Sequence, residues 1–205
     1  MVIHKVLDEV FSTWSNIAVL RVLRKCDMGI TGREVARLSG MSPKNCLITL
    51  STLENYGMVY RVRGGRDHIF SLNRENVIVK EVVLTGLQVE EEYFERLAAD
   101  IKKLLRKFTV SIIVFGSVAR KEETLESDID LCLLIKDKAH KEAIEKRLPD
   151  IQAVIKKKYG IAVSPIYFTQ TEFVLKAKSK KPPLNGIVKD GILISGLSIR
   201  ELLND

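Results

Sequence analysis

The chain has 205 residues, of which 46% are hydrophobic and 29% are charged, and it carries a formal net charge of +7. This composition indicates one or two soluble globular units, each with a packed core. It argues against a membrane protein, because no apolar run reaches the roughly 18–20 residues that a bilayer span requires. The N-terminus has no signal-peptide pattern, so we expect a cytoplasmic protein with no membrane partner.

Positive charge is concentrated in the first part of the chain. Residues 1–80 contain 12 Lys and Arg against 7 Asp and Glu, a balance of +5, whereas residues 81–205 contain 21 against 19, a balance of +2. An excess of basic side chains favours contact with nucleic acid. The first part is therefore the better candidate for a DNA-binding surface.

Helix signals dominate the first part. Apolar spacing predicts one or two helices over residues 4–26. A capping-box pair, Thr31 and Glu34, starts the next helix. Ser42, followed by a proline, starts another helix, which Gly57 ends.

A β-hairpin is predicted after these helices. Residues 58–63 and 67–72 read as strands, and two glycines lie between them at a tight turn. Three helices followed by a hairpin make a winged helix. Over roughly residues 15–73 the sequence resembles winged-helix DNA-binding domains of the ArsR and MarR kinds.

This resemblance implies that the second helix of the motif enters the DNA major groove and that the hairpin contacts the backbone or the minor groove. The side chains expected to contact DNA are Ser42, Lys44, Asn45 and Thr49 on the helix, and Arg61, Arg63 and Arg66 on the hairpin. Such domains commonly dimerise on two-fold sites, so a second copy of the chain is an expected partner. A winged helix that serves only for protein docking or dimerisation is the alternative.

Residues 74–107 read as helix in two pieces that are broken near Gly86. We expect the second piece, residues 86–107, to link the two halves. We place the boundary near residue 80, so that residues 1–80 form the winged helix and residues 81–205 form a second domain.

Strands alternate with helices after residue 109. Strands are predicted at residues 110–115, 128–135, 161–169 and 191–195, and helices at residues 138–158 and 172–178. This order predicts an α/β domain with a mixed sheet flanked by helices. The whole chain is therefore expected to be α+β, with a winged helix of three helices and a β-hairpin before that domain.

Two carboxylates interrupt the second of these strands. Asp128 and Asp130 are two residues apart, so they point to the same face, and like charges so close need a cation. Mg²⁺ prefers oxygen ligands and usually takes one or two carboxylates together with phosphate and water. Gly116 and Ser117 end the preceding strand and offer close backbone approach and free amides to an anion, to which Arg120 adds charge. This combination is typical of phosphoryl or nucleotidyl transfer.

The stretch "FGSVARKEETLESDIDLCLLI" resembles the nucleotidyltransferase superfamily that includes DNA polymerase beta, and its small stand-alone prokaryotic members in particular. The family pattern G-S-x-A-R-G followed by S-D-I-D-L is matched except at its last glycine, which is Lys121 here. The resemblance implies that Asp128 and Asp130 bind Mg²⁺ or Mn²⁺ for catalysis. It also implies that the nucleoside triphosphate, with ATP expected, is bound through Gly116, Ser117, Arg120 and Ser127.

Active members of this family carry a third carboxylate on the following central strand. Residues 160–169 contain no acid, and Ser164 or Pro165 occupies the expected position. Glu172 lies beyond the strand and is a poor substitute. Whether the domain catalyses transfer is therefore open.

Two functions from different classes follow. The first is an enzyme that transfers a nucleotide monophosphate to a hydroxyl acceptor and is coupled to a DNA-binding winged helix. The second is a DNA-binding transcriptional regulator, or an antitoxin, whose degenerate transferase domain senses a nucleotide. For the antitoxin, the resemblance implies a small helical toxin protein as partner. The residues leave the acceptor, the nucleotide base and the DNA sequence open.

Overall fold

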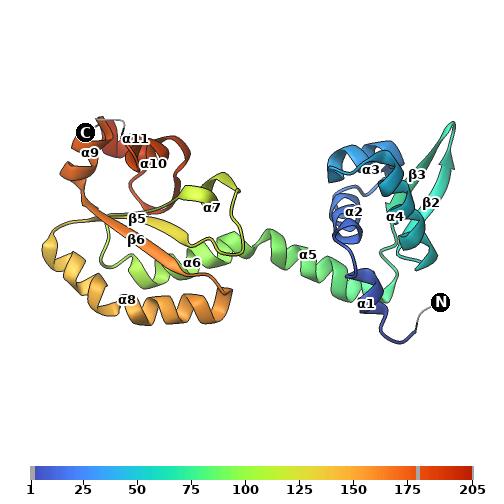
Figure 1. Ribbon diagram of the computed structural model, residues 1–205, viewed down its shortest axis with the longest axis horizontal. Helices are drawn as coiled ribbons and strands as arrows, with labels where there is room; N and C mark the ends of the chain where they lie inside the picture. The colour runs from blue at the N-terminus through green and yellow to red at the C-terminus, as the bar shows by residue number, and fades with distance from the viewer. Residues whose placement is uncertain (1–2, 179–180, 205) are drawn as a thin grey trace. The chain divides into compact units, whose positions relative to one another are not determined.

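The computed structural model describes residues 3–178 and 181–204 of the chain (Figure 1). The chain divides into two compact units, Met1–Glu92 and Tyr93–Asp205. The sequence predicts a boundary near residue 80. The first unit extends further because Val83 and Leu87 are buried in its core.

The first unit is a winged helix. Its sheet has the order β1-β3-β2 and is antiparallel throughout, with β2 and β3 forming the predicted hairpin. The two-residue strand β1 was not predicted, because so short a segment carries no periodic signal. The elements are α1 (Val6–Val10), α2 (Trp14–Arg24), β1 (Ile30–Thr31), α3 (Gly32–Ser39), α4 (Pro43–Asn55), β2 (Val59–Gly64) and β3 (Asp67–Leu72).

Side-chain caps begin α3 and α4 where the sequence indicates. The Thr31 hydroxyl accepts a hydrogen bond from the Glu34 amide at 3.2 Å. The Glu34 carboxylate accepts a bond from Arg37 at 2.8 Å, so no bond back to Thr31 completes the capping box. The Ser42 hydroxyl accepts from the Asn45 amide at 3.3 Å and caps α4.

The helical stretch after the hairpin belongs to the first unit. It contains a π-helical turn, η1 (Val79–Val83), followed by α5 (Leu84–Glu91). Two ion pairs, Arg21–Glu90 and Arg24–Glu91, hold α5 against α2. The predicted break near Gly86 is wrong, because Gly86 lies inside α5. The predicted linker helix is instead two helices, with Glu92 as the turn between α5 and α6.

The second unit is built on a mixed sheet, as predicted, and its strand order is β6-β5-β4-β7. β5 and β6 are parallel, and the other pairs are antiparallel. The short helices α10 and α11 were not predicted. The elements are α6 (Tyr93–Leu105), β4 (Ser111–Phe115), α7 (Gly116–Arg120), β5 (Ile129–Ile135), α8 (Lys138–Tyr159), β6 (Val163–Thr169), α9 (Gln170–Lys178), α10 (Leu184–Asp190), β7 (Ile192–Gly196) and α11 (Ile199–Asn204).

Helices cover both faces of this sheet (Figure 1). Ile129, Leu131 and Leu133 face α6 and α8, and their side chains are fully buried. Residues at the alternate positions, such as Cys132 and Leu134, face α9, α10 and α11. Asp130 lies on this second face, at the end of β5 where the apolar core stops. Among the described residues, no helix is long and apolar enough to cross a bilayer.

Candidate functional site

The carboxylates of Asp128 and Asp130 lie close together, as the alternation of side chains predicts. Asp130 pairs with Phe115 of β4, and Asp128 immediately precedes β5. The pKa of Asp130 is raised above its usual value, chiefly because burial disfavours its charged form and also because Asp128 repels it. The Arg120 guanidinium lowers the pKa of Asp130 and partly offsets this. The pair therefore forms an acidic site with unbalanced negative charge.

Gly116 lies directly against the Asp130 carboxylate. Its φ is +75°, in the left-handed region that glycine adopts without strain. A Cβ atom placed on Gly116 would overlap Oδ2 of Asp130. Glycine is therefore required at position 116 for two reasons. The turn into α7 has a positive φ, and the Asp130 carboxylate leaves no space for a Cβ atom.

We expect Gly116→Ala to lower the free energy of unfolding by about 1–3 kcal/mol, because alanine at positive φ is strained and its methyl group displaces Asp130. Urea unfolding measures the change. Gly186→Ala is the matched control, since its Cβ would meet nothing within 4 Å in α10 and alanine favours helix. A Gly116→Ala protein as stable as the wild type would show that this contact is not tight.

Ser164 is one of the two residues, with Pro165, expected at the position of a third carboxylate. It pairs with Asp130 in the parallel register of β5 and β6, and its hydroxyl donates to Oδ2 of Asp128 at 2.8 Å. Glu172 is engaged elsewhere, because its carboxylate accepts a hydrogen bond from the Thr169 amide at 2.8 Å and caps α9. Within residues 3–178 and 181–204, no group of three or more acidic, His or Cys side chains is arranged to hold a metal.

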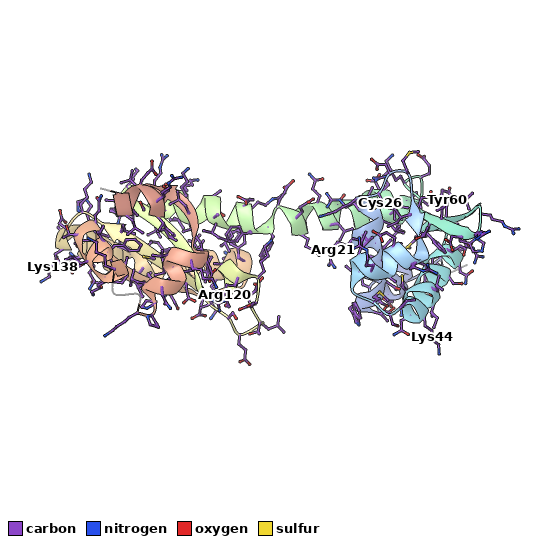
Figure 2. The ribbon with its side chains drawn as sticks, turned by 90° about the horizontal axis from the view of Figure 1, so that it is seen from above. Arg21, Cys26, Lys44, Tyr60, Arg120 and Lys138 are labelled. Atoms are coloured by element: carbon purple, nitrogen blue, oxygen red, sulfur yellow. The ribbon has the colours of Figure 1, made fainter. Side chains whose placement is uncertain are left out.

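Arg120 ends α7 and lies near enough to Asp130 to lower the pKa of that carboxyl (Arg120 is labelled in Figure 2). Its Nε donates to the Glu122 carboxylate at 2.7 Å, and this bond raises the pKa of the guanidinium, with smaller contributions from Asp190 and Asp130. Lys121, where the family has glycine, keeps the left-handed conformation with φ 59° and ψ 38°. Lys121 therefore adopts at this turn a conformation that glycine adopts without strain.

Ser127 shapes the loop that leads to Asp128. Its hydroxyl accepts a hydrogen bond from the Thr124 amide at 2.9 Å, and its own amide donates to the Thr124 carbonyl at 3.1 Å. A contact between Ser127 and a nucleotide stays a prediction.

The donor set of this site fits a hard divalent cation. Asp128 and Asp130 supply the carboxylates, and the Ser164 hydroxyl adds a neutral oxygen. Mg²⁺ usually takes one or two protein carboxylates and completes its coordination with water and phosphate. Its charge would also relieve the repulsion that raises the pKa of Asp130.

The predicted DNA-contacting residues of α4 are exposed with one exception. Ser42, Lys44 and Asn45 lie at the surface (Lys44 is labelled in Figure 2). The prediction that Thr49 contacts DNA is wrong, because this residue is only 6% exposed and cannot reach DNA. It lies on the buried face of α4, between Cys46 and Leu53.

Sequence reasoning missed two exposed apolar residues of α4. Leu47 is 51% exposed and Ile48 is 57% exposed. Helical phase was the signal that could have found them, because the inward spacing of Cys46, Leu50 and Leu53 leaves positions 47 and 48 outside.

The three hairpin arginines differ in whether they form an ion pair within the protein. Arg61 on β2 forms an ion pair with Glu54 of α4 at 3.1 Å. Arg63 and Arg66, at and beside the turn, form no ion pair with any residue that the structure describes. These two are therefore available to an external anion.

Residues 94–190 match the nucleotidyltransferase domain family, and the chain belongs to this family. The putative protein adenylyltransferase of Methanocaldococcus jannaschii is 31% identical over 80 residues, which are 39% of this chain and 80% of that protein. The resemblance drawn from the Gly-Ser and Asp-x-Asp pattern is thus confirmed.

Solved structures of two regulators also share similarity with this chain. A MarR-family transcriptional regulator from Rhodococcus sp. RHA1 aligns with a TM-score of 0.35 and 16% identity, over 42% of this chain and 65% of that one. The MepR–DNA complex of S. aureus aligns with a TM-score of 0.36 and 20% identity, over 51% of this chain and 90% of that one. This chain spans slightly less than two thirds of the Rhodococcus regulator.

Proposed function

We propose that the second unit binds a nucleoside triphosphate with Mg²⁺ and transfers its nucleotide monophosphate to a hydroxyl acceptor, and that the winged helix binds DNA. ATP is the first nucleotide to test, since the relative from M. jannaschii is named as an adenylyltransferase. The observation that carries the proposal is the placement of Asp130 against Gly116 at one end of the sheet, with Asp128 near enough to raise the pKa of Asp130 by repulsion.

Each residue of the site has a role in this proposal. Asp128 and Asp130 hold the divalent ion, which when bound neutralises charge on the phosphate oxygens. Gly116 and Ser117 line the triphosphate, where the absence of a side chain at Gly116 admits close approach. Arg120 contacts a phosphate and balances its charge.

Calorimetric titration of the full chain with ATP tests nucleotide binding. We expect binding with Mg²⁺ and at least about tenfold weaker binding with EDTA, because the two carboxylates repel a bare triphosphate. Titrations with GTP, CTP and UTP give the base preference. An absence of heat with all four nucleotides in the presence of Mg²⁺ would remove the proposal.

Ser164 favours a second candidate function, a DNA-binding regulator in which the second unit senses a nucleotide without transferring it. A serine hydroxyl is not a base at neutral pH, so it cannot take the proton of an attacking hydroxyl as a carboxylate does. This candidate predicts Mg²⁺-dependent nucleotide binding with no labelled product.

A helical toxin protein as acceptor or partner also stays a prediction, and co-purification with the product of a neighbouring gene tests it.

We expect the double variant Arg63→Ala, Arg66→Ala to bind DNA at least roughly tenfold more weakly than wild type, because two phosphate contacts are lost. The slope of log affinity against log salt should fall by about 2. Gel shifts on the DNA upstream of its own gene, between about 50 and 200 mM salt, measure both. Lys80→Ala removes a charge outside α4 and the hairpin and is the control. Equal affinity and slope in variant and wild type would leave the winged helix as a docking module.

A further inference from the structure

The outer edge of strand β7 carries no further strand in the described part of the chain. β7 ends the sheet of order β6-β5-β4-β7, and only its inner edge is paired, with β4. An unpaired strand edge exposes backbone donors and acceptors that can pair with another chain. Ile192 and Leu193 pair regularly with β4, and the register shift between Ile112 and Ile113 leaves Ile194 as an extra residue, a β-bulge, before Ser195.

Helix α6 borders this edge and forms a groove with it. A hollow of about 270 Å³ is lined by Phe94, Glu95, Ala98, Ala99 and Lys102 of α6 and by Ile192, Leu193 and Ile194 of β7. The two alanines leave space where larger side chains would cover the strand. The groove therefore exposes the strand edge together with a small-residue stretch of helix.

One acidic and one basic side chain border this groove. Glu95 and Lys102 are seven residues apart on α6, two helical turns, so they lie on the same face with the alanines between them. Both are exposed, and neither has an ion-pair partner among residues 3–178 and 181–204. One end of the groove is thus negative and the other positive.

We propose that this groove is a dimer interface in which a second copy of the chain adds its β7 antiparallel to β7 and its α6 beside α6. Antiparallel pairing of a strand with itself requires a two-fold axis. The same axis, passing near Ala98 and Ala99, brings Glu95 to the partner's Lys102 and Lys102 to the partner's Glu95. The backbone edge and the charge pattern therefore specify one symmetry operation. A peptide strand of unrelated sequence could pair with the backbone of β7, but it would not be expected to carry charges that match both Glu95 and Lys102.

Sedimentation velocity of the full chain, from about 1 to 100 μM, tests this interface. We expect a concentration-dependent dimer for the wild type. Glu95→Lys or Lys102→Glu alone should raise the dimer dissociation constant by about tenfold or more, since each change creates two like-charge contacts across the axis. The double variant Glu95→Lys, Lys102→Glu should restore the wild-type constant to within about threefold. Lys103→Glu, also exposed on α6 but outside the groove, should have no effect.

Three results would overturn the interface. A wild type that stays monomeric at about 100 μM excludes it. A dimer that is indifferent to both single reversals forms through another surface, such as the winged helix. A double variant that stays monomeric, with circular dichroism and melting temperature equal to wild type, shows that the two charges do not meet. Because the three positions tested, Glu95, Lys102 and Lys103, are exposed, loss of folding is not expected to obscure these outcomes.

Discussion

Asp130→Asn is expected to weaken ATP binding in the presence of Mg²⁺ by at least about tenfold, toward the affinity in EDTA, and Asp128→Asn is expected to do the same. Each change removes one of the two carboxylates that the proposed ion requires. Because the ion and the triphosphate bind as a unit, no loss is expected in EDTA, where each variant should bind ATP at least as tightly as the wild type since it repels the triphosphate less. Calorimetric titrations with and without Mg²⁺ measure both constants.

Protein stability separates this loss from misfolding. The metal-free Asp130→Asn protein should be at least as stable as the wild type, because burial and Asp128 both disfavour the Asp130 charge that the variant lacks. Glu126→Gln, an exposed carboxylate of the same loop, is the matched control and should bind like the wild type. Mg²⁺-dependent binding that survives both Asn variants would mean that the ion is held elsewhere.

Ser164→Asp is expected to increase Mg²⁺ affinity by about tenfold and to raise the rate of nucleotide transfer at least tenfold. Aspartate at this position adds a carboxylate where the serine hydroxyl now contacts Asp128. Without metal, a third negative charge beside Asp128 and Asp130 should lower the melting temperature, and Mg²⁺ should restore it. Thermal melts across a Mg²⁺ series and transfer of label from α-³²P ATP measure the two effects.

Ser164→Asn supplies a similar volume without charge and should show neither gain. The outcome for Ser164→Asp also distinguishes the two proposed functions. A variant with tighter Mg²⁺ binding and new transfer indicates an enzyme that serine has slowed. A variant with tighter binding and no transfer indicates a nucleotide sensor. Mg²⁺ affinity equal to that of Ser164→Asn would show that position 164 is not part of the site.

Much of the candidate site could be predicted because strand geometry is local. The two-residue period of β5 was enough to put Asp128 and Asp130 on one face. The length of β6 reduced the third position to Ser164 or Pro165, and the structure shows Ser164 beside them. The hydrogen bond from Arg120 to Glu122 could not be predicted, because it depends on the path of an irregular turn.

Elements that depend on tertiary packing were predicted less well. Thr49 looked exposed because threonine is polar, yet the rotation of α4 about its axis is set by the apolar residues on either side. The boundary was placed too early because nothing local shows that Val83 and Leu87 are buried in the first unit. α10 and α11 are too short for helical periodicity to be recognised, and α10 follows two prolines.

The bond between Arg120 and Glu122 has a consequence for how phosphate would be recognised. The guanidinium already holds a carboxylate, with Asp130 and Asp190 contributing to its field. If Arg120 contacts a phosphate as we propose, the incoming group displaces a resident anion instead of meeting a bare cation. Selection among anionic ligands at Arg120 would then depend less on their total charge than on their geometry. A phosphate would have to accept hydrogen bonds from the same planar guanidinium that now donates to the Glu122 carboxylate.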